Sequence, residues 1–302
     1  MRIRRLVLAV LSVVALVTLA ACGGGGGSDQ AAGGGGGQAP KTLRFGVGPF
    51  LPSASDTRAA YEPFFKYLAD ELGTDYELDV TADFAGISVA LANDQVDLAW
   101  MGPYGYVLAN NDSGAQAIAT VNYEGKPIYH SIVVGPPDSP VKNWPDDAKG
   151  MSSSFTEVAS TSGWLIPTYV LSQRGIDPMT FFEYSEGAAH PANEIAVATG
   201  RVDLATDYDR NRQAMIDSGD LKPDATKVVW TSEPLPNDAI AVRSGFDPEL
   251  ARRIQDILVK ITPEQAKDFM PEHYTGFVSA SDASYKLIKD AAVSLGKLKG
   301  QS

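Results

Sequence analysis

The amino-acid sequence predicts a mixed α/β protein built from two similar lobes. From residue 42 onward, segments of alternating apolar residues are followed by segments with helical spacing, a pattern typical of a sheet covered by helices. In addition, residues 89–99 (VALANDQVDLA) align without a gap on residues 195–205 (IAVATGRVDLA). The two copies lie too far apart for a solenoid repeat. Two α/β lobes therefore explain them better than chance similarity between alanine- and valine-rich helices.

The first lobe is expected to begin with a strand at residues 43–47, which stops at Gly48 and Pro49. A helix follows, because possible capping residues at 55–57 precede apolar side chains at helical spacing, and Gly73 ends the pattern. The next expected elements are a strand at 76–80, a helix at 87–93 and a strand at 96–100.

The N-terminal segment has the features of an export signal. Residues 1–21 combine a positively charged start with an apolar run that is too short and too early for a stable membrane span. The segment leads into Leu-Ala-Ala-Cys-Gly at residues 19–23, which resembles the bacterial lipoprotein signal box. We therefore expect acylation of the thiol of Cys22, the only cysteine, although a chance cysteine behind an ordinary signal peptide is the alternative. Glycine runs within residues 22–41 predict a flexible tether.

Composition and motifs narrow the function. The formal net charge of −12 argues against nucleic acid or an anionic lipid surface as a partner. A small anionic ligand stays possible, because backbone dipoles can bind anions without net positive charge. The sequence has no Gly-x-Ser-x-Gly or His-Glu-x-x-His motif, and its three histidines are dispersed. We therefore expect a protein that is not an enzyme and that uses no metal and no cofactor.

A hydroxyl-rich segment is the strongest candidate for a binding site. Ser160, Thr161, Ser162 and Gly163 precede an apolar helix predicted at residues 164–174. The start of a helix offers unpaired N–H groups and a positive dipole end, so three added hydroxyls predict an oxyanion nest that needs no lysine or arginine. Plain helix capping is the alternative, but capping needs one hydroxyl rather than three.

Further candidates lie where the repeated strands end. In open α/β sheets, ligands sit beyond the carboxyl ends of the strands. Trp100 and Met101 follow the first Val-Asp-Leu-Ala copy, and Asp207 follows the second. Asp97 and Asp203, inside the two copies, are expected to be structural.

The order and spacing of many short segments resemble the phosphate/phosphite/phosphonate solute-binding protein family of ABC transporters. The resemblance covers nearly all of the chain after the tether. The matching segments are 43–46 (LRFG), 96–99 (VDLA), 102–103 (GP), 106–109 (YVLA), 129–131 (YHS), 160–163 (STSG), 175–178 (GIDP), 181–182 (FF), His190, 196–197 (AV), 200–203 (GRVD), 236–238 (PND) and 276–277 (GF).

This resemblance implies a type II periplasmic-binding-protein fold, in which a hinge joins two α/β lobes around a ligand cleft. Lobe 1 would comprise residues 42–132 plus about 239–302, and lobe 2 residues 133–238 approximately. The resemblance also assigns the oxyanion to the hydroxyl-rich segment, a histidine and an acid, with a tyrosine beside the hinge. The corresponding residues are Ser160, Thr161, Ser162, Gly163, His190, Asp238 and Tyr129.

The resemblance also implies a role for Asp207, because the corresponding acid contacts the amine in members that bind aminophosphonates.

Some positions depart from the family pattern. Trp100 and Met101 stand where a tyrosine or phenylalanine is common, and Trp164 follows Gly163 where a smaller or phenolic ring is common. We expect the two indoles to narrow or reshape the cleft.

The expected function is capture of a small phosphorus oxyanion for an ABC importer. Phosphite, an alkylphosphonate, an aminophosphonate and phosphate remain open. An ionised Asp238 can only accept hydrogen bonds, so it favours a ligand that carries a proton or an amine. The expected partners are a permease and an ATPase, and the expected form is a monomer outside the cytoplasm, anchored to the membrane by lipidated Cys22. The alternatives are a sensory or scaffold lipoprotein and a binder of another small organic anion.

Overall fold

A computed structural model describes residues 40–51 and 53–298. The predicted signal peptide at 1–21, Cys22 and all but the last two residues of the predicted tether at 22–41 lie outside the described residues. Within the described part of the chain, no helix has both the length and the apolar character needed to cross a membrane.

The first of two large sheets has six strands in the order β13-β4-β12-β3-β1-β2. The strand β1 runs parallel to β2 and β3, whereas β12 pairs antiparallel with β3 and β4, and β13 antiparallel with β4. The strands are β1 (Thr42–Val47), β2 (Asp75–Val80), β3 (Leu98–Met101), β4 (Gln116–Tyr123), β12 (Ala239–Val242) and β13 (Tyr274–Ser279).

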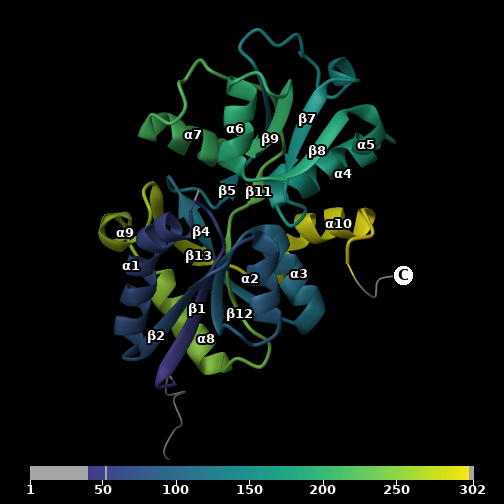
Figure 1. Ribbon diagram of the computed structural model, residues 1–302. Helices are drawn as coiled ribbons and strands as arrows, with labels where there is room; N and C mark the ends of the chain where they lie inside the picture. The colour runs from purple at the N-terminus through teal and green to yellow at the C-terminus, as the bar shows by residue number, and fades with distance from the viewer. Residues whose placement is uncertain (1–39, 52, 299–302) are drawn as a thin grey trace, which may run out of the picture. The chain divides into compact units, whose positions relative to one another are not determined.

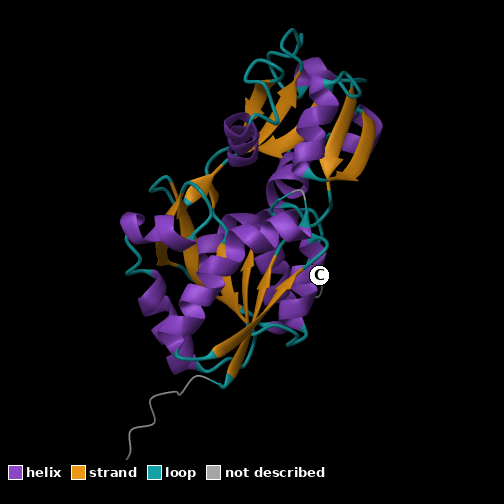
Figure 2. Ribbon diagram, turned by 60° about the vertical axis from the view of Figure 1, so that its left-hand side comes forward, coloured by secondary structure: helices purple, strands orange, loops and turns teal. Residues whose placement is uncertain are grey.

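Helices cover both faces of this sheet (Figure 2). One face packs against α1 (Ala54–Leu72), α8 (Pro248–Leu258) and α9 (Pro263–Phe269), and the other against α2 (Phe84–Ala92), α3 (Pro103–Ser113) and α10 (Lys286–Ser294). Gly73 ends α1 with φ of 68°, a left-handed conformation that favours glycine, as its position predicted. The helix predicted at 87–93 begins earlier, at Phe84, because the Asp83 side chain accepts the N–H of Gly86 and caps it.

The second sheet has five strands in the order β10-β6-β9-β7-β8. The strands β7, β8 and β9 are parallel, and β6 pairs antiparallel with both β9 and β10. The elements of this part are β6 (Ser131–Gly135), β7 (Ser152–Thr156), α4 (Ile166–Ser172), α5 (Pro178–Phe181), β8 (Glu183–Ala188), α6 (His190–Ala198), β9 (Leu204–Tyr208), α7 (Asp209–Ser218) and β10 (Lys227–Thr231).

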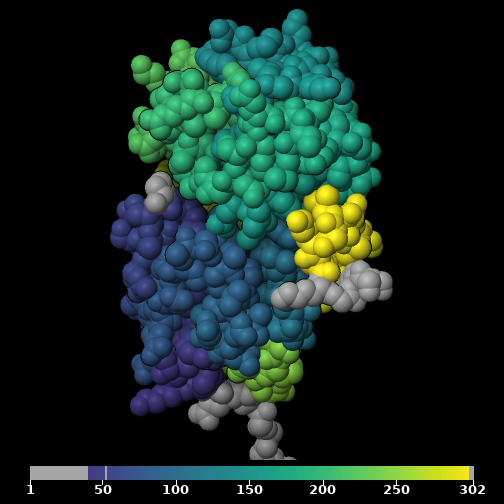
Figure 3. Space-filling model, turned by 45° about the vertical axis from the view of Figure 1, so that its right-hand side comes forward, coloured from purple at the N-terminus to yellow at the C-terminus, as the bar shows by residue number. Residues whose placement is uncertain are grey.

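The chain passes between the two sheets twice. The first passage is β5 (Ile128–Tyr129) and the return is β11 (Leu235–Pro236), and these strands pair antiparallel with each other between the sheets (Figure 1). The C-terminal helix α10 contacts both α3 and α4, so it also bridges the two parts (Figure 3).

The two copies of the repeated sequence occupy equivalent places. Each copy spans the end of a helix, a turn and a buried strand, with α2 and β3 in the first and α6 and β9 in the second. Asp97 accepts hydrogen bonds from Arg44 and Arg243, and Asp203 accepts from the backbone and hydroxyl of Ser152. Both acids therefore tie neighbouring strands together, as the sequence analysis expected for structural residues.

Candidate ligand-binding site

A small cavity of about 30 Å³ lies between the two sheets. Phe50, Phe84, Gly102 and Pro103 line it from the first sheet and its helices. Gly105 belongs to the same group. Tyr129, on β5, and Asp238, just after β11, line the cavity where the chain passes between the sheets. The remaining lining residues come from the second sheet and its helices: Ala159, Ser160, Thr161, Ser162, His190, Tyr208 and Arg210.

The hydroxyl-rich segment forms the start of a helix, as predicted, but with a wider first turn. Residues Thr161–Leu165 form a π-helical turn that continues into α4, and Leu165 N–H donates to Ser160 O at 3.0 Å. Ser160 caps this helix by accepting the N–H of Gly163 at 3.1 Å. Such wide turns are frequent at functional sites. The first N–H groups of the helix, at Thr161 and Ser162, therefore lie at the cavity wall without an intrahelical acceptor.

Side chains from neighbouring strands hold this helix start in place. The Ser131 hydroxyl, on β6, donates to Ser162 O, and the Thr206 hydroxyl, on β9, donates to Gly163 O, each at 2.6 Å. Gly163 itself does not line the cavity. A Cβ at this position would lie 2.0 Å from Thr156 Oγ1, on β7, so only glycine fits here.

His190 belongs to a buried chain of hydrogen bonds. Its Nδ1 lies 2.8 Å from Asp207 Oδ1, and its Nε2 lies 3.0 Å from Ser160 Oγ. Burial lowers the pKa of His190 to about 3, so the ring is neutral near neutral pH. With Nδ1–H donated to Asp207, Nε2 accepts the Ser160 hydroxyl proton. His190 therefore orients Ser160, and both of its ring nitrogens are already engaged with protein groups.

Asp207 lies behind the cavity wall and is fully buried, with 0% of its side chain exposed. Its carboxylate accepts from His190 and from Asn211 Nδ2. Burial raises the pKa of Asp207 to about 7. Asp207 thus supports the wall from behind and does not line the cavity itself.

Asp238 lies at the cavity wall, as predicted, beside a cation that the sequence analysis did not foresee. Arg210 Nη2 lies 3.7 Å from Asp238 Oδ1, and Trp100 Nε1 donates to Asp238 Oδ2 at 3.3 Å. Burial raises the pKa of Asp238, while Arg210 and Trp100 oppose that rise. The cavity wall therefore includes an arginine, which the hydroxyl-rich segment alone did not predict.

Trp100, Met101 and Trp164 do not line the cavity. Trp100 and Met101 point into hydrophobic cores on opposite faces of the first sheet, because β3 is an inner strand covered on both sides. Trp164 turns its indole N–H away to Glu186 Oε2 at 2.9 Å. The two indoles therefore do not narrow the cavity.

Two hydrogen bonds join the two sheets across the cavity. Glu157 Oε1 accepts the N–H of Phe84, the first residue of α2, at 2.6 Å. Thr161 Oγ1 accepts the N–H of Tyr104, near the start of α3, at 2.8 Å.

The described residues contain no group of three or more histidine, cysteine or acidic side chains placed to hold a metal ion.

Comparisons with known proteins place the chain among transport proteins. Residues 45–285 match the family model described as "ABC transporter, phosphonate, periplasmic substrate-binding protein". The phosphate-import protein PhnD of Mycolicibacterium smegmatis is 30% identical over 268 residues, which cover 82% of this chain and 83% of that protein. The phosphonates-binding periplasmic protein of Escherichia coli is 28% identical over 259 residues, covering 84% of this chain and 76% of that protein.

Solved structures agree on the fold. A binding-protein component of an ABC phosphonate transporter from Pseudomonas aeruginosa superposes with a TM-score of 0.75 at 24% identity, covering 86% of this chain and 90% of that chain. PhnD1 from Prochlorococcus marinus, in complex with methylphosphonate, gives a TM-score of 0.73 at 17% identity, covering 86% of this chain and all of that chain.

Proposed function

Because the chain belongs to the family of periplasmic substrate-binding proteins of ABC phosphonate transporters, we propose that its cavity captures a small phosphorus oxyanion. The observation that carries this proposal is the helix start at Thr161 and Ser162, which presents N–H and hydroxyl donors to the cavity beside the Arg210 guanidinium. Backbone N–H groups, hydroxyl groups and guanidinium groups all donate hydrogen bonds to the charged oxygens of phosphate and phosphonate groups.

The family and the type II periplasmic-binding-protein fold predicted from the sequence are confirmed. The chain is a binding protein rather than an enzyme. Asp207, His190 and Ser160 do hydrogen-bond in the order of a hydrolytic triad. We assign this chain of bonds to the orientation of the Ser160 hydroxyl at the binding site.

Capture would proceed by closure of two lobes, with the boundaries expected from the sequence: residues 42–132 plus about 239–302, and about 133–238. The bonds from Phe84 N–H to Glu157 and from Tyr104 N–H to Thr161 form only when the lobes meet, so they stabilise the closed state. A ligand shifts the equilibrium toward this state only through a higher affinity for it. Ligand contacts with the lobe 1 residues that line the cavity, Phe50, Phe84, Gly102 and Pro103, would supply that difference.

The cavity size favours a compact ligand. The cavity offers about 30 Å³, which is room for two or three water-sized groups at roughly 10–15 Å³ each. Among the candidate ligands, the compact tetrahedral anions phosphite, phosphate and methylphosphonate need the least expansion of this volume. The M. smegmatis relative is named for phosphate import and the E. coli relative for phosphonates. Their sequence identities to this chain are similar, so identity alone does not choose between phosphate and a phosphonate as its ligand.

Replacing either hydroxyl should weaken binding without unfolding the protein. A charge-assisted hydrogen bond contributes about 1.5–3 kcal/mol, so Thr161→Ala and Ser162→Ala should each lower the affinity for methylphosphonate about ten- to a hundredfold. Folding should change little, because Ser160 still caps the helix; Thr161→Ala also removes the bond from Tyr104 N–H that stabilises the closed state, so Ser162→Ala is the cleaner test of ligand contact. Ser172→Ala, at the far end of α4, is the matched control, since its hydroxyl bonds only Tyr169 O. Unchanged calorimetric isotherms for both variants would place the site elsewhere.

As a member of a periplasmic family, the chain acts outside the cytoplasm and delivers its ligand to an ABC transporter. We propose further that it works as a monomer held at the membrane by lipidated Cys22, with residues 22–41 as the tether.

Cys22→Ser should release the protein from membranes while the thermal unfolding of residues 40–298 stays unchanged, because residue 22 lies before the residues that the structure describes. Fractionation of cells that express each form measures this, and a Cys22→Ser protein that still pellets with membranes would contradict the lipid anchor.

A further inference from the structure

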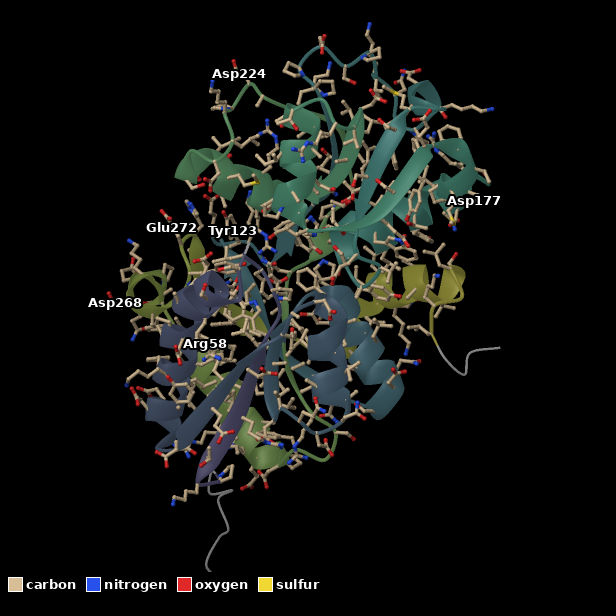
Figure 4. The ribbon with its side chains drawn as sticks, viewed as in Figure 1. Arg58, Tyr123, Asp177, Asp224, Asp268 and Glu272 are labelled. Atoms are coloured by element: carbon tan, nitrogen blue, oxygen red, sulfur yellow. The ribbon has the colours of Figure 1, made fainter. Side chains whose placement is uncertain are left out.

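The Arg210 guanidinium sits inside a cluster of aromatic rings, here called the tyrosine cage: Tyr123, Tyr129, Tyr208 and Tyr274. Its central carbon lies 4.8 Å from the ring centre of Tyr129, 5.2 Å from Tyr123, 5.6 Å from Tyr208 and 5.7 Å from Tyr274. Tyr123, labelled in Figure 4, reaches the cage from the end of β4, whereas Arg210 comes from the start of α7. Both sheets therefore contribute to the cage.

The tyrosine cage and Asp238 together have the chemistry of a cation site. Aromatic faces within about 6 Å attract a cation, and cages of this kind bind ammonium ligands in other proteins. Asp238 adds a carboxylate 3.7 Å from the guanidinium, and only 8% of the Arg210 side chain is exposed. The cation that occupies this site belongs to the protein itself.

Arg210 also keeps donors free. Its Nε is buried and has no hydrogen-bond partner, and its Nη1 reaches Tyr274 Oη only at 3.5 Å. The guanidinium, whose side chain lines the cavity, therefore has donor capacity left for a ligand oxygen.

We propose that Arg210 fills the cation subsite of this pocket, so that the pocket takes phosphorus oxyanions that lack a cation of their own, such as phosphate, phosphite or methylphosphonate, and rejects aminoalkylphosphonates. This inference rests on the proposed function, because it presupposes that the pocket binds a phosphorus oxyanion. It makes Arg210 a specificity-determining residue as well as an anchor for the ligand charge.

An ammonium group on a ligand would have to share with Arg210 the only acid among the residues that line this cavity. Asp238 already faces Arg210. The other acid that the family resemblance connects with an amine, Asp207, is fully buried and bonded to His190 and Asn211. A ligand ammonium would therefore lie against the guanidinium, and two like charges that are desolvated together are strongly disfavoured.

The test is calorimetric titration of the purified protein with methylphosphonate and with 2-aminoethylphosphonate. The wild type should prefer methylphosphonate by about a hundredfold or more, because the amine would have to share its only counter-ion with Arg210. Arg210→Ala should bind methylphosphonate more weakly and should shrink the preference by at least about tenfold, because the emptied cage and Asp238 can receive the amine. Arg210→Lys keeps a cation in the cage and should keep the preference. Arg252→Ala, an exposed arginine of α8 outside the cavity lining, should leave both affinities unchanged.

The outcomes separate this inference from the proposed function. If the wild type prefers 2-aminoethylphosphonate, or if Arg210→Ala weakens both ligands by the same factor, the cation-subsite assignment is overturned while phosphorus binding stands. If the folded wild type binds neither compound, nor phosphate or phosphite, the proposed function is overturned and the inference with it. Should Arg210→Ala fail to fold, the wild type and Arg210→Lys still decide the question by their preference between the two compounds.

Discussion

Replacing Gly163 with alanine should lower the free energy of unfolding by about 1–3 kcal/mol, the usual cost of inserting an atom into a packed core. The new Cβ would lie 2.0 Å from Thr156 Oγ1 and 2.5 Å from its Cγ2. Thr156 is a buried residue of an inner strand and cannot give way, so the helix start must shift.

That shift should also remove tight binding. Moving the helix start displaces the donors of both Thr161 and Ser162, and loss of two charge-assisted bonds weakens affinity by about a hundredfold or more. Thermal unfolding and calorimetric titration measure the two effects. The double variant Gly163→Ala with Thr156→Ala removes Oγ1 and Cγ2 and should recover part of both losses. Tight binding by the single variant would show that the placement of this helix start is not critical.

Asp238→Asn should have the second large effect, on stability and on selectivity. Arg210 would remain buried without its counter-ion, and breaking a buried ion pair costs about 3–5 kcal/mol of unfolding free energy. Asp238 and Arg210 are both nearly inaccessible to solvent, so water cannot replace the lost carboxylate.

Selectivity should relax in the same variant. An ionised Asp238 can only accept, so it suits a ligand oxygen that carries a proton, which phosphate-type groups retain in part because their second pKa is about 6. Methanesulfonate has no proton to share near neutral pH, whereas an asparagine amide can donate to it. The ratio of affinities for methylphosphonate and methanesulfonate, measured by calorimetry on both proteins, tests this. An unchanged ratio together with an unchanged melting temperature would exclude this role for Asp238.

The sequence predicted the hydroxyl-rich segment because its signal is local. Three hydroxyls and a glycine before an apolar helix can be recognised without knowledge of the fold, and Ser160, Thr161 and Ser162 do line the cavity. Trp100 and Met101 were harder to place. Their position at a strand end suggested the ligand wall, but an inner strand buries side chains on both faces.

The sequence did not predict Arg210 as a site residue, for a different reason. It follows Asp207, Tyr208 and Asp209 at the carboxyl end of β9, a place where ligand contacts are expected, but an arginine among acidic residues at the start of a helix usually lies in solvent. Its burial depends on rings that β4, β5 and β13 bring from distant parts of the sequence. The two hydrogen bonds that link Asp207 to His190 and His190 to Ser160 likewise join residues of β9, of α6 and of the helix start before α4. No local sequence pattern predicts contacts between such distant segments.

The most direct test of the account is a thermal-shift series on the wild-type protein with phosphate, phosphite, methylphosphonate, sulfate and methanesulfonate. A ligand that binds only the folded state stabilises it by about 2.7 kcal/mol at a hundred times its Kd. The account predicts a concentration-dependent rise in melting temperature with at least one of the three phosphorus compounds, and a smaller rise or none with the two sulfur compounds. A rise with methanesulfonate or sulfate, and none with any phosphorus compound, would contradict it.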